Sequence, residues 1–209
     1  MHAMPTCEEE DAARRRGLNC IAGIDEAGRG PLAGPVVAAA VVLPSGYALP
    51  GLDDSKKITS SRRERLYEAL VADATVLHGI GRADVEEIDR LNILRATHLA
   101  MRRAVEALPA LPDLCLIDGL PVREFPWPQK AIVKGDSKCL SIAAASILAK
   151  VTRDRYMREL GLLFPAYGFE RHCGYGTKQH LAALHQHGIT LHHRRLFGPV
   201  AQMLLPFDR

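Results

Sequence analysis

Short apolar runs alternate along this chain with longer segments of helical periodicity. The first two runs, Ile21–Ile24 and Val36–Val42, are wholly apolar and predict buried strands. A third strand is predicted over Thr75–Ile80, and three strands in such close succession indicate an antiparallel meander. Leu114–Ile117 and Lys130–Lys134 predict two further strands. The pattern therefore predicts a five-stranded sheet in an α/β domain.

Two helical regions begin with the spacing of a capping box, in which a polar side chain and an acid three residues later satisfy the first backbone N–H groups. The first region, over 61–72, begins with Ser61 and Glu64. The second begins at Asp84 with the same spacing and extends to Pro109, where the proline ends it. Each region has an apolar face, and we expect the second to pack on the sheet.

The longest helical pattern covers Ser141–Leu162, with small residues on one face and basic residues on another. On the basic face we expect Lys150, Arg153 and Arg155 to be exposed. A shorter helix is predicted over 177–187.

A length of 209 residues suits one domain with a small appendage. We expect a flexible leader or a short helix over 1–17, a core over 18–163, and a helical extension over 164–209 that packs on the core. No apolar run reaches the ~18 to 20 residues that span a bilayer, and the N-terminus is acidic where a signal peptide would be apolar. We therefore expect a cytoplasmic monomer with no membrane partner. Five scattered cysteines, an odd number, predict reduced thiols.

The net charge is only +3, but the basic residues occur in clusters. These are Arg14–Arg16, Lys56–Lys57, Arg62–Arg63, Arg102–Arg103 and Arg194–Arg195. Such clusters are typical of solvated helix faces, and they indicate a polyanionic partner where they share one side of a molecule.

Acidic residues stand where three of the predicted strands end. Asp25 and Glu26 follow the first strand, Asp118 follows the fourth and Asp136 follows the fifth. Each of them alone is explained by a turn or a helix cap. The ends of neighbouring strands lie side by side in an α/β sheet, so the four carboxylates together would form a pocket whose mutual repulsion divalent cations relieve. Ligands that are all oxygen select Mg²⁺ or Mn²⁺. A run of two further acids, Asp53 and Asp54, is an additional source of ligands.

The turn after the first strand is rich in glycine. Adjacent residues of a strand face opposite sides of the sheet, so Asp25 and Glu26 converge only if the chain leaves the pleat there. Gly28 and Gly30 make that departure cheap. They also leave a bare backbone beside the carboxylates, which suits an ion or a phosphate.

The same glycines leave open a dinucleotide-binding loop, and with it a nicotinamide oxidoreductase. Gly28, Gly30 and Gly34 nearly match the fingerprint of such loops. The spacing is one residue too long, and Pro31 stands where the helix should begin. Asp25 and Glu26 would also repel a bound pyrophosphate unless a metal ion lay between them.

Several longer blocks carry more specific information. They are DEAGRGPLAGPVVAAAVVL, DDSKKIT, NILRATHLAM, LIDG, KGD followed by SIAAASILAKVTRDRYM, and GYGTKQH. In this order and at these distances they closely resemble ribonuclease HII, over about Ile21 to Val200. The resemblance implies the ribonuclease H-like fold, a five-stranded mixed sheet flanked by helices with a helical C-terminal extension. It also implies an endonuclease that hydrolyses the RNA strand of RNA/DNA hybrids and incises 5′ of ribonucleotides embedded in duplex DNA.

The resemblance further implies which residues do the work. Metal binding and catalysis by two Mg²⁺ or Mn²⁺ ions are assigned to Asp25, Glu26, Asp118 and Asp136. Implied substrate contacts are Gly28, Arg29 and Gly30 at the ribose 2′-hydroxyl, Tyr175 against the sugar past the cut, and also Lys57 and Ser137.

The chain departs from the family pattern at two positions. Cys173 precedes GYGT where a lysine is common, and Leu196 stands in HHRRLF where HRRSF is usual. Neither residue is one of the acids, so we expect weakened binding at most.

Three further interpretations stay open. The histidines of the C-terminal third leave room for a zinc site, although their spacing matches no zinc pattern. A non-catalytic module that binds RNA/DNA hybrids would use the basic helix and Tyr175 without requiring acids at three strand ends. Ribonuclease HIII resembles the same core but carries an extra N-terminal domain.

Overall fold

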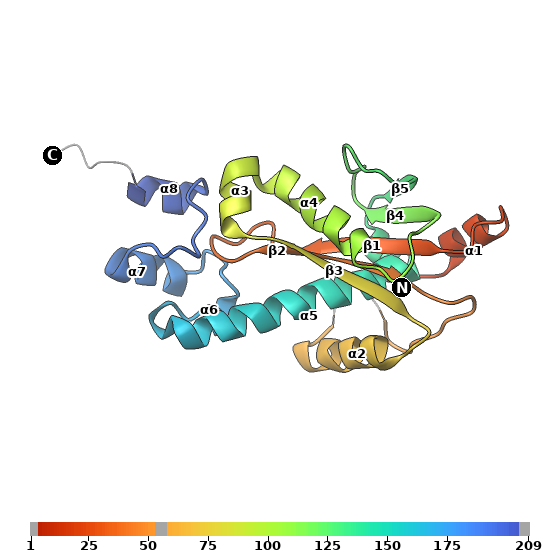
Figure 1. The fold of residues 1–209 in the computed structure, drawn as a ribbon. Coiled ribbons are helices and arrows are strands. Elements are labelled where there is room, and N and C mark those ends of the chain that lie inside the picture. Colours follow the sequence, from red (N-terminus) through yellow and green to blue (C-terminus); the bar gives the residue numbers. More distant parts are fainter. Residues whose placement is uncertain (1–3, 53–57, 205–209) are drawn as a thin grey trace.

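The computed structural model describes residues 4–52 and 58–204, and its centre is a five-stranded mixed sheet (Figure 1). The strands are β1 (Ile21–Ala27), β2 (Val36–Val42), β3 (Leu77–Ala83), β4 (Leu114–Asp118) and β5 (Gln129–Ile132), in the order β3-β2-β1-β4-β5. Strands β1, β2 and β3 pair antiparallel, as the predicted meander requires, whereas β4 and β5 are parallel to β1. The α/β class and the five strands are thereby confirmed.

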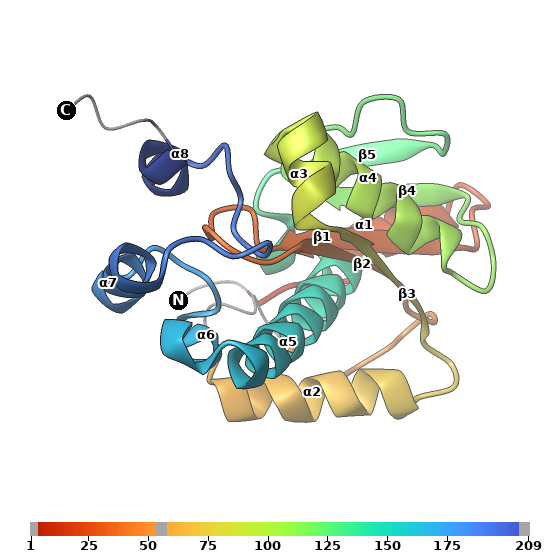
Figure 2. The ribbon, with the colours of Figure 1, turned by 60° about the vertical axis from the view of Figure 1, so that its left-hand side comes forward.

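Helices cover both faces of this sheet (Figure 2). The helices of the described residues are α1 (Glu8–Arg14), α2 (Ser60–Ala72), α3 (Val85–Leu91), α4 (Ile93–Glu106), α5 (Leu140–Leu163), α6 (Phe169–His172), α7 (Lys178–His187) and α8 (Gly198–Leu204), with 3₁₀ turns η1 (Gly135–Ser137) and η2 (Pro165–Tyr167). Helix α4 packs on one face through a buried apolar cluster, and α5 packs on the other with α2 outside it. No helix in the described part of the chain is both long enough and apolar enough to cross a bilayer.

Small residues let α5 approach the central strand closely. A Cβ atom added to Gly23 on β1 would lie 2.2 Å from the carbonyl carbon of Ser141, in the first turn of α5. The alanines of the SIAAAS block are fully buried against the same sheet. The helix is therefore fixed over the strand that carries Asp25.

Several element boundaries differ from those predicted. Strand β1 continues through Asp25 and Glu26, which pair with Ala39 and Ala38 of β2, so the chain does not leave the pleat at these acids. The cap of α2 is Thr59 instead of Ser61, because the Thr59 hydroxyl accepts the N–H of Arg62.

The capping box at Asp84 and Glu87 is confirmed. The long region that follows is divided into α3 and α4 at Asn92, whose φ of 70° breaks the helix.

A flexible leader or a short helix was predicted over residues 1–17, and the structure contains a short helix there, α1. In α1 the Glu10 side chain is 1% exposed, and its carboxylate accepts the backbone N–H of Ser141 at 2.8 Å. Helix α1 thus caps the start of α5.

Candidate active site

Three carboxylates meet at one end of the sheet. Asp25 lies on β1 and Asp118 ends β4, and these strands are parallel neighbours, with Ile24 opposite Ile117. Asp136 lies on η1, after β5. One carboxylate oxygen from each acid lies within 4.8 Å of the other two. The strand ends therefore bring these three acids to one point.

Glu26 lies beside this group and is not a member of it. Glu26 is the next residue of β1, where it pairs with Ala38 of β2, and it lines the neighbouring cleft. Its Oε1 accepts a hydrogen bond from Nη1 of Arg29 at 3.1 Å. Its charge still contributes to the negative field at Asp25.

The group is electrostatically strained without a cation. Burial first, and then the charges of Glu26, Asp118 and Asp136, raise the pKa of Asp25 well above its usual value. Asp25 accepts the N–H of Glu26 at 2.7 Å, and Asp118 accepts the N–H of Gly135 at 2.7 Å. Neither Asp25 nor Asp118 forms an ion pair with a residue that the structure describes. Clustered oxygen ligands with this excess of negative charge fit a divalent cation.

A cleft of about 480 Å³ opens beside Glu26. Its lining includes Gly28, Arg29, Gly30 and Tyr175, together with Arg63, Ser146, Lys150 and Arg153. The glycine turn and the GYG segment face each other across it, since a Cβ atom on Gly30 would lie 3.7 Å from Cε1 of Tyr175. The Tyr175 side chain is 46% exposed and so is accessible to a ligand.

A family model described as Ribonuclease HII matches residues 22–199, most of the chain. The chain belongs to the ribonuclease HII family. Ribonuclease HII of Bacillus cereus (strain Q1) is 54% identical over 195 residues, which cover 93% of this chain and 75% of that protein.

Solved structures agree with this assignment. Ribonuclease H2 from Pyrococcus horikoshii OT3 has a TM-score of 0.73 and 26% identity, covering 88% of this chain and 96% of that one. RNase HII from Archaeoglobus fulgidus, solved in a complex with PCNA, has a TM-score of 0.72 and 27% identity, covering 86% and 95%. The predicted ribonuclease H-like fold is therefore confirmed.

Membership of the ribonuclease HII family makes the chain a ribonuclease H, an endonuclease that acts on nucleic acid and depends on divalent metal. The family assignment therefore replaces two alternative interpretations of the sequence, a nicotinamide oxidoreductase and a non-catalytic module that binds RNA/DNA hybrids. The family match also favours ribonuclease HII over ribonuclease HIII.

The basic face predicted for α5 is wrong at Arg153. This side chain is 1% exposed, because its guanidinium donates to the carbonyl oxygens of Ala33, Pro35 and Cys173 at 2.9 to 3.1 Å. It joins the loop after β1 to the segment that precedes GYG. The carbonyl of Cys173, one of the two departures from the ribonuclease HII pattern, takes part in this bonding.

Arg194, assigned to a basic surface cluster, is also fully buried. Its guanidinium donates to the carbonyl oxygens of Gly28, Arg29, Gly34 and Pro35, at 2.6 to 3.1 Å. The C-terminal segment therefore fixes the backbone of the glycine turn. The neighbours of both arginines in the sequence are polar or charged, so no local signal indicates their burial.

The remaining site predictions lie near the acids or outside the described residues. Ser137 follows Asp136 on η1, and its hydroxyl donates to the carbonyl of Lys134 at 2.9 Å. Lys57 lies outside the described residues, as do Lys56 and the acids Asp53 and Asp54.

Buried histidines support the GYG segment. Nδ1 of His180 lies 2.9 Å from the carbonyl oxygen of Tyr175, and its Nε2 lies 3.0 Å from Nε2 of His193. His172 stacks on His180 with ring centroids 4.7 Å apart. Among the described residues these rings belong to no group that could hold a metal ion, and their nitrogens bond to backbone carbonyls and to each other.

Acid is expected to destabilise the protein through His193. Burial, and then the neighbouring His180, lower the pKa of His193 to about 4. The unfolded chain therefore binds the proton more readily, and stability falls as the pH drops from about 6.5 towards 4, by about 2 kcal/mol at pH 5. Urea unfolding at pH 7 and pH 5 measures this loss.

The matched control is His185→Gln, since His185 is exposed on α7. This variant should keep the full pH dependence, whereas His193→Gln should reduce it. Equal pH dependence in both variants would assign the acid sensitivity to other groups.

Proposed function

We propose that this ribonuclease H cleaves the RNA strand of RNA/DNA hybrids and incises 5′ of single ribonucleotides embedded in duplex DNA. The observation that carries the proposal is the position of three carboxylates, within 4.8 Å of one another, beside a cleft whose lining includes the bare backbone of Gly28 and Gly30. The carboxylates suit a phosphodiester with bound cations, and the bare backbone suits recognition of a ribose.

Asp25, Asp118 and Asp136, with Glu26 beside them, would hold two Mg²⁺ or Mn²⁺ ions. Bound there, the ions would activate a water and stabilise the leaving 3′-oxygen in an in-line displacement that gives 3′-hydroxyl and 5′-phosphate ends. The acids themselves orient the site and keep it negative until cations arrive. The hydrogen bond from Gly135 to Asp118 fixes one of these carboxylates in place.

Gly28, Arg29 and Gly30 are proposed to contact the 2′-hydroxyl, and Tyr175 to pack on the next sugar. A backbone without side chains can approach the hydroxyl closely enough to bond, and DNA would leave those bonds unmade. Tyr175 is exposed, and its Cε1 would lie 3.7 Å from a Cβ atom added to Gly30, which supports this role. Ser137 and Lys57 are proposed as contacts to the adjacent phosphates.

We also propose a division of the chain into a catalytic core and a C-terminal extension. Residues 18–163 form the catalytic core, and residues from 164 onwards support its glycine turn through Arg194. The extension would therefore contribute to substrate binding.

Two glycine variants are expected to separate fold from recognition. A Cβ on Gly30 meets only Tyr175 at 3.7 Å, so Gly30→Ala should fold normally and raise KM for a ribonucleotide substrate about tenfold. Gly28 has a φ of +96°, and its Cβ would lie 2.0 Å from Nε of Arg153, so Gly28→Ala should lose about 2 kcal/mol of stability or more. Steady-state kinetics and urea unfolding measure both effects. Wild-type KM in Gly30→Ala would remove that residue from recognition.

The function is tested with a DNA duplex that contains one ribonucleotide, offered with Mg²⁺, with Mn²⁺ and with a chelator. Incision on the 5′ side of the ribonucleotide, lost with the chelator, is the expected result. An RNA/DNA hybrid and an all-DNA duplex are run beside it. Equal cutting of the all-DNA duplex would refute the proposed recognition of the 2′-hydroxyl.

A further inference from the structure

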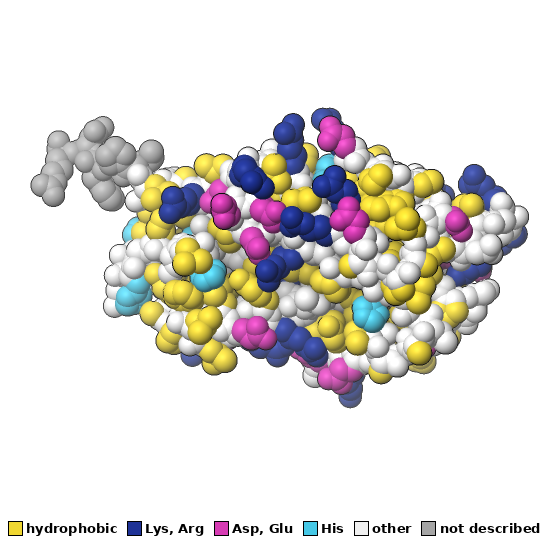
Figure 3. Space-filling model, viewed as in Figure 1, with side chains coloured by type: hydrophobic (Ala, Val, Ile, Leu, Met, Phe, Trp, Pro, Cys, Tyr) yellow, Lys and Arg dark blue, Asp and Glu magenta, His cyan; other side chains and the backbone are white. Residues whose placement is uncertain are grey.

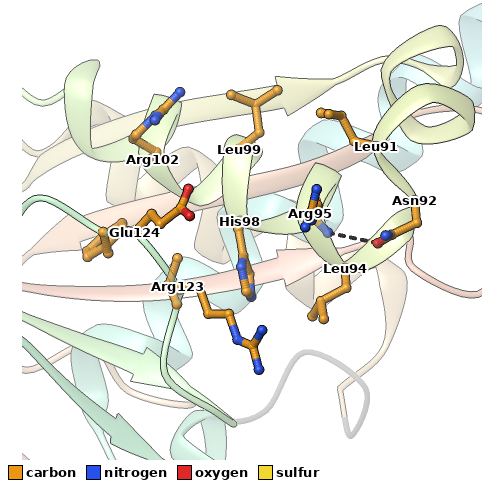
Figure 4. Close-up of a pocket in the computed structure, with 11 residues that line it drawn as sticks. Leu91, Asn92, Leu94, Arg95, His98, Leu99, Arg102, Arg123 and Glu124 are labelled. Carbon is orange, nitrogen blue, oxygen red and sulfur yellow. Dashed lines mark hydrogen bonds between the residues drawn. The ribbon is translucent and has the colours of Figure 1, made fainter.

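A second cavity, of about 380 Å³, lies between the first turns of α4 and the loop after β4. Figure 4 shows Arg95, His98 and Arg123 projecting into it from these two segments. Leu94 and Val122 contribute an apolar part of its wall. We call it the α4 pocket. A nucleic-acid backbone is complementary to these features, because its anionic phosphates would face the arginines and the carbon atoms of its sugars would face the apolar wall.

Three arginines line the α4 pocket, and only Arg102 among them forms an ion pair with another described residue, Glu106 at 3.7 Å. On the face shown in Figure 3, basic and acidic side chains are interspersed over α3 and α4. The ion pair between Arg103 and Glu87, at 2.8 Å, is one example. In contrast, Arg95 and Arg123 are exposed and form no ion pair with a described residue. Their charge is available to an external anion.

The α4 pocket is close to the cleft of the active site. Burial, and then the positive charges of Arg29 and Arg123, lower the pKa of His98, which lines the α4 pocket. Arg29 lines the active-site cleft. The loop that carries Arg123 begins directly after Asp118, so one strand end supplies both an acid of the site and a cation of the pocket.

We propose that the α4 pocket binds a backbone phosphate of the same duplex that the active site cuts, to one side of the scissile bond. This inference rests on the proposed function, since it takes the cleft to hold the duplex. The contact would position the duplex and would not depend on base sequence.

The test compares the double variant Arg95→Gln/Arg123→Gln with a matched control. Arg15→Gln/Arg16→Gln removes the same charge from exposed positions that precede β1, at the opposite end of that strand from the acids. Binding of a ribonucleotide-containing duplex is measured with a chelator present, by fluorescence anisotropy at several KCl concentrations. Thermal unfolding checks that both variants fold.

The pocket variant should bind about tenfold more weakly than the control, and its slope of log Kd against log salt should fall by about 1 to 2. Its kcat at saturating substrate should stay within about twofold of wild type while KM rises. An unchanged slope and affinity would overturn the proposal. So would a loss of kcat at unchanged KM.

Two further binding measurements identify the ligand of the α4 pocket. Shortening the duplex on one side should abolish the difference between the pocket variant and the control. Inorganic phosphate at millimolar concentration should not compete with the duplex; competition in wild type that is lost in the pocket variant would instead indicate a small-anion site and overturn the proposal. Because binding is measured without cleavage, failure of the pocket and failure of the nuclease assignment give different results.

Discussion

Asp25→Asn is expected to reduce kcat by about 10³-fold or more while duplex affinity stays within about twofold of wild type. The amide keeps the shape of the side chain and removes one of the charges that would hold the cations. Asp136→Asn should behave in the same way, because its carboxylate lies in the same group. Single-turnover cleavage with Mg²⁺ and anisotropy binding with a chelator measure the two effects.

Thermal unfolding gives an independent readout of the same site. Mg²⁺ should raise the Tm of wild type, since it binds the folded state only, and should not raise that of Asp25→Asn. Without metal the variant should be as stable as wild type or more so, because burial and neighbouring acids already disfavour the Asp25 carboxylate. Glu159→Gln, which changes an exposed acid on α5, is the control that should leave all three measurements unchanged. Normal Mg²⁺-dependent cutting by Asp25→Asn would exclude it from catalysis.

The acids could be predicted because strand ends are visible in a sequence. A short apolar run predicts a strand, and parallel neighbours place the residues that follow them at one edge. The strand ends alone therefore predict that Asp118 and Asp136 lie beside Asp25, as they do. The place where β1 ends could not be predicted in this way, because it depends on a partner strand. Strand β2 supplies backbone pairs as far as Ala27, so Asp25 and Glu26 both lie within the strand.

The buried arginines could not be predicted for a different reason. Helical periodicity assigns a charged side chain to the solvent, and Arg153 conforms to that pattern along α5. Its burial depends on carbonyl groups from segments more than 100 residues earlier in the chain, those of Ala33 and Pro35. No local pattern records such partners. The histidines at 180 and 193 are a similar case, since their contact is made only when the extension folds back.

Arg194→Met is expected to destabilise the protein by about 3 to 5 kcal/mol. The substitution removes the Arg194 donors from the carbonyls of Gly28, Arg29 and Gly34, and leaves that of Pro35 with Arg153 alone. Burial, and then the charge of Arg153, lower the pKa of Arg194 to about 9, so the charge is retained at neutral pH and the bonds are charge-assisted. Urea unfolding at pH 7 measures the loss.

Activity should respond separately from stability. At a temperature where Arg194→Met is still folded, the freed glycine turn should raise KM for the ribonucleotide duplex, because the proposed contacts to the 2′-hydroxyl are made by that backbone. Arg194→Lys keeps the charge but cannot bridge four carbonyls, so it should fall between wild type and Arg194→Met. Arg195→Met alters the exposed neighbour and should stay within about 0.5 kcal/mol of wild type. Equal losses in Arg194→Met and Arg195→Met would mean that the buried guanidinium does not fix the turn. A stable Arg194→Met with wild-type KM would show that substrate recognition does not depend on the Arg194 guanidinium.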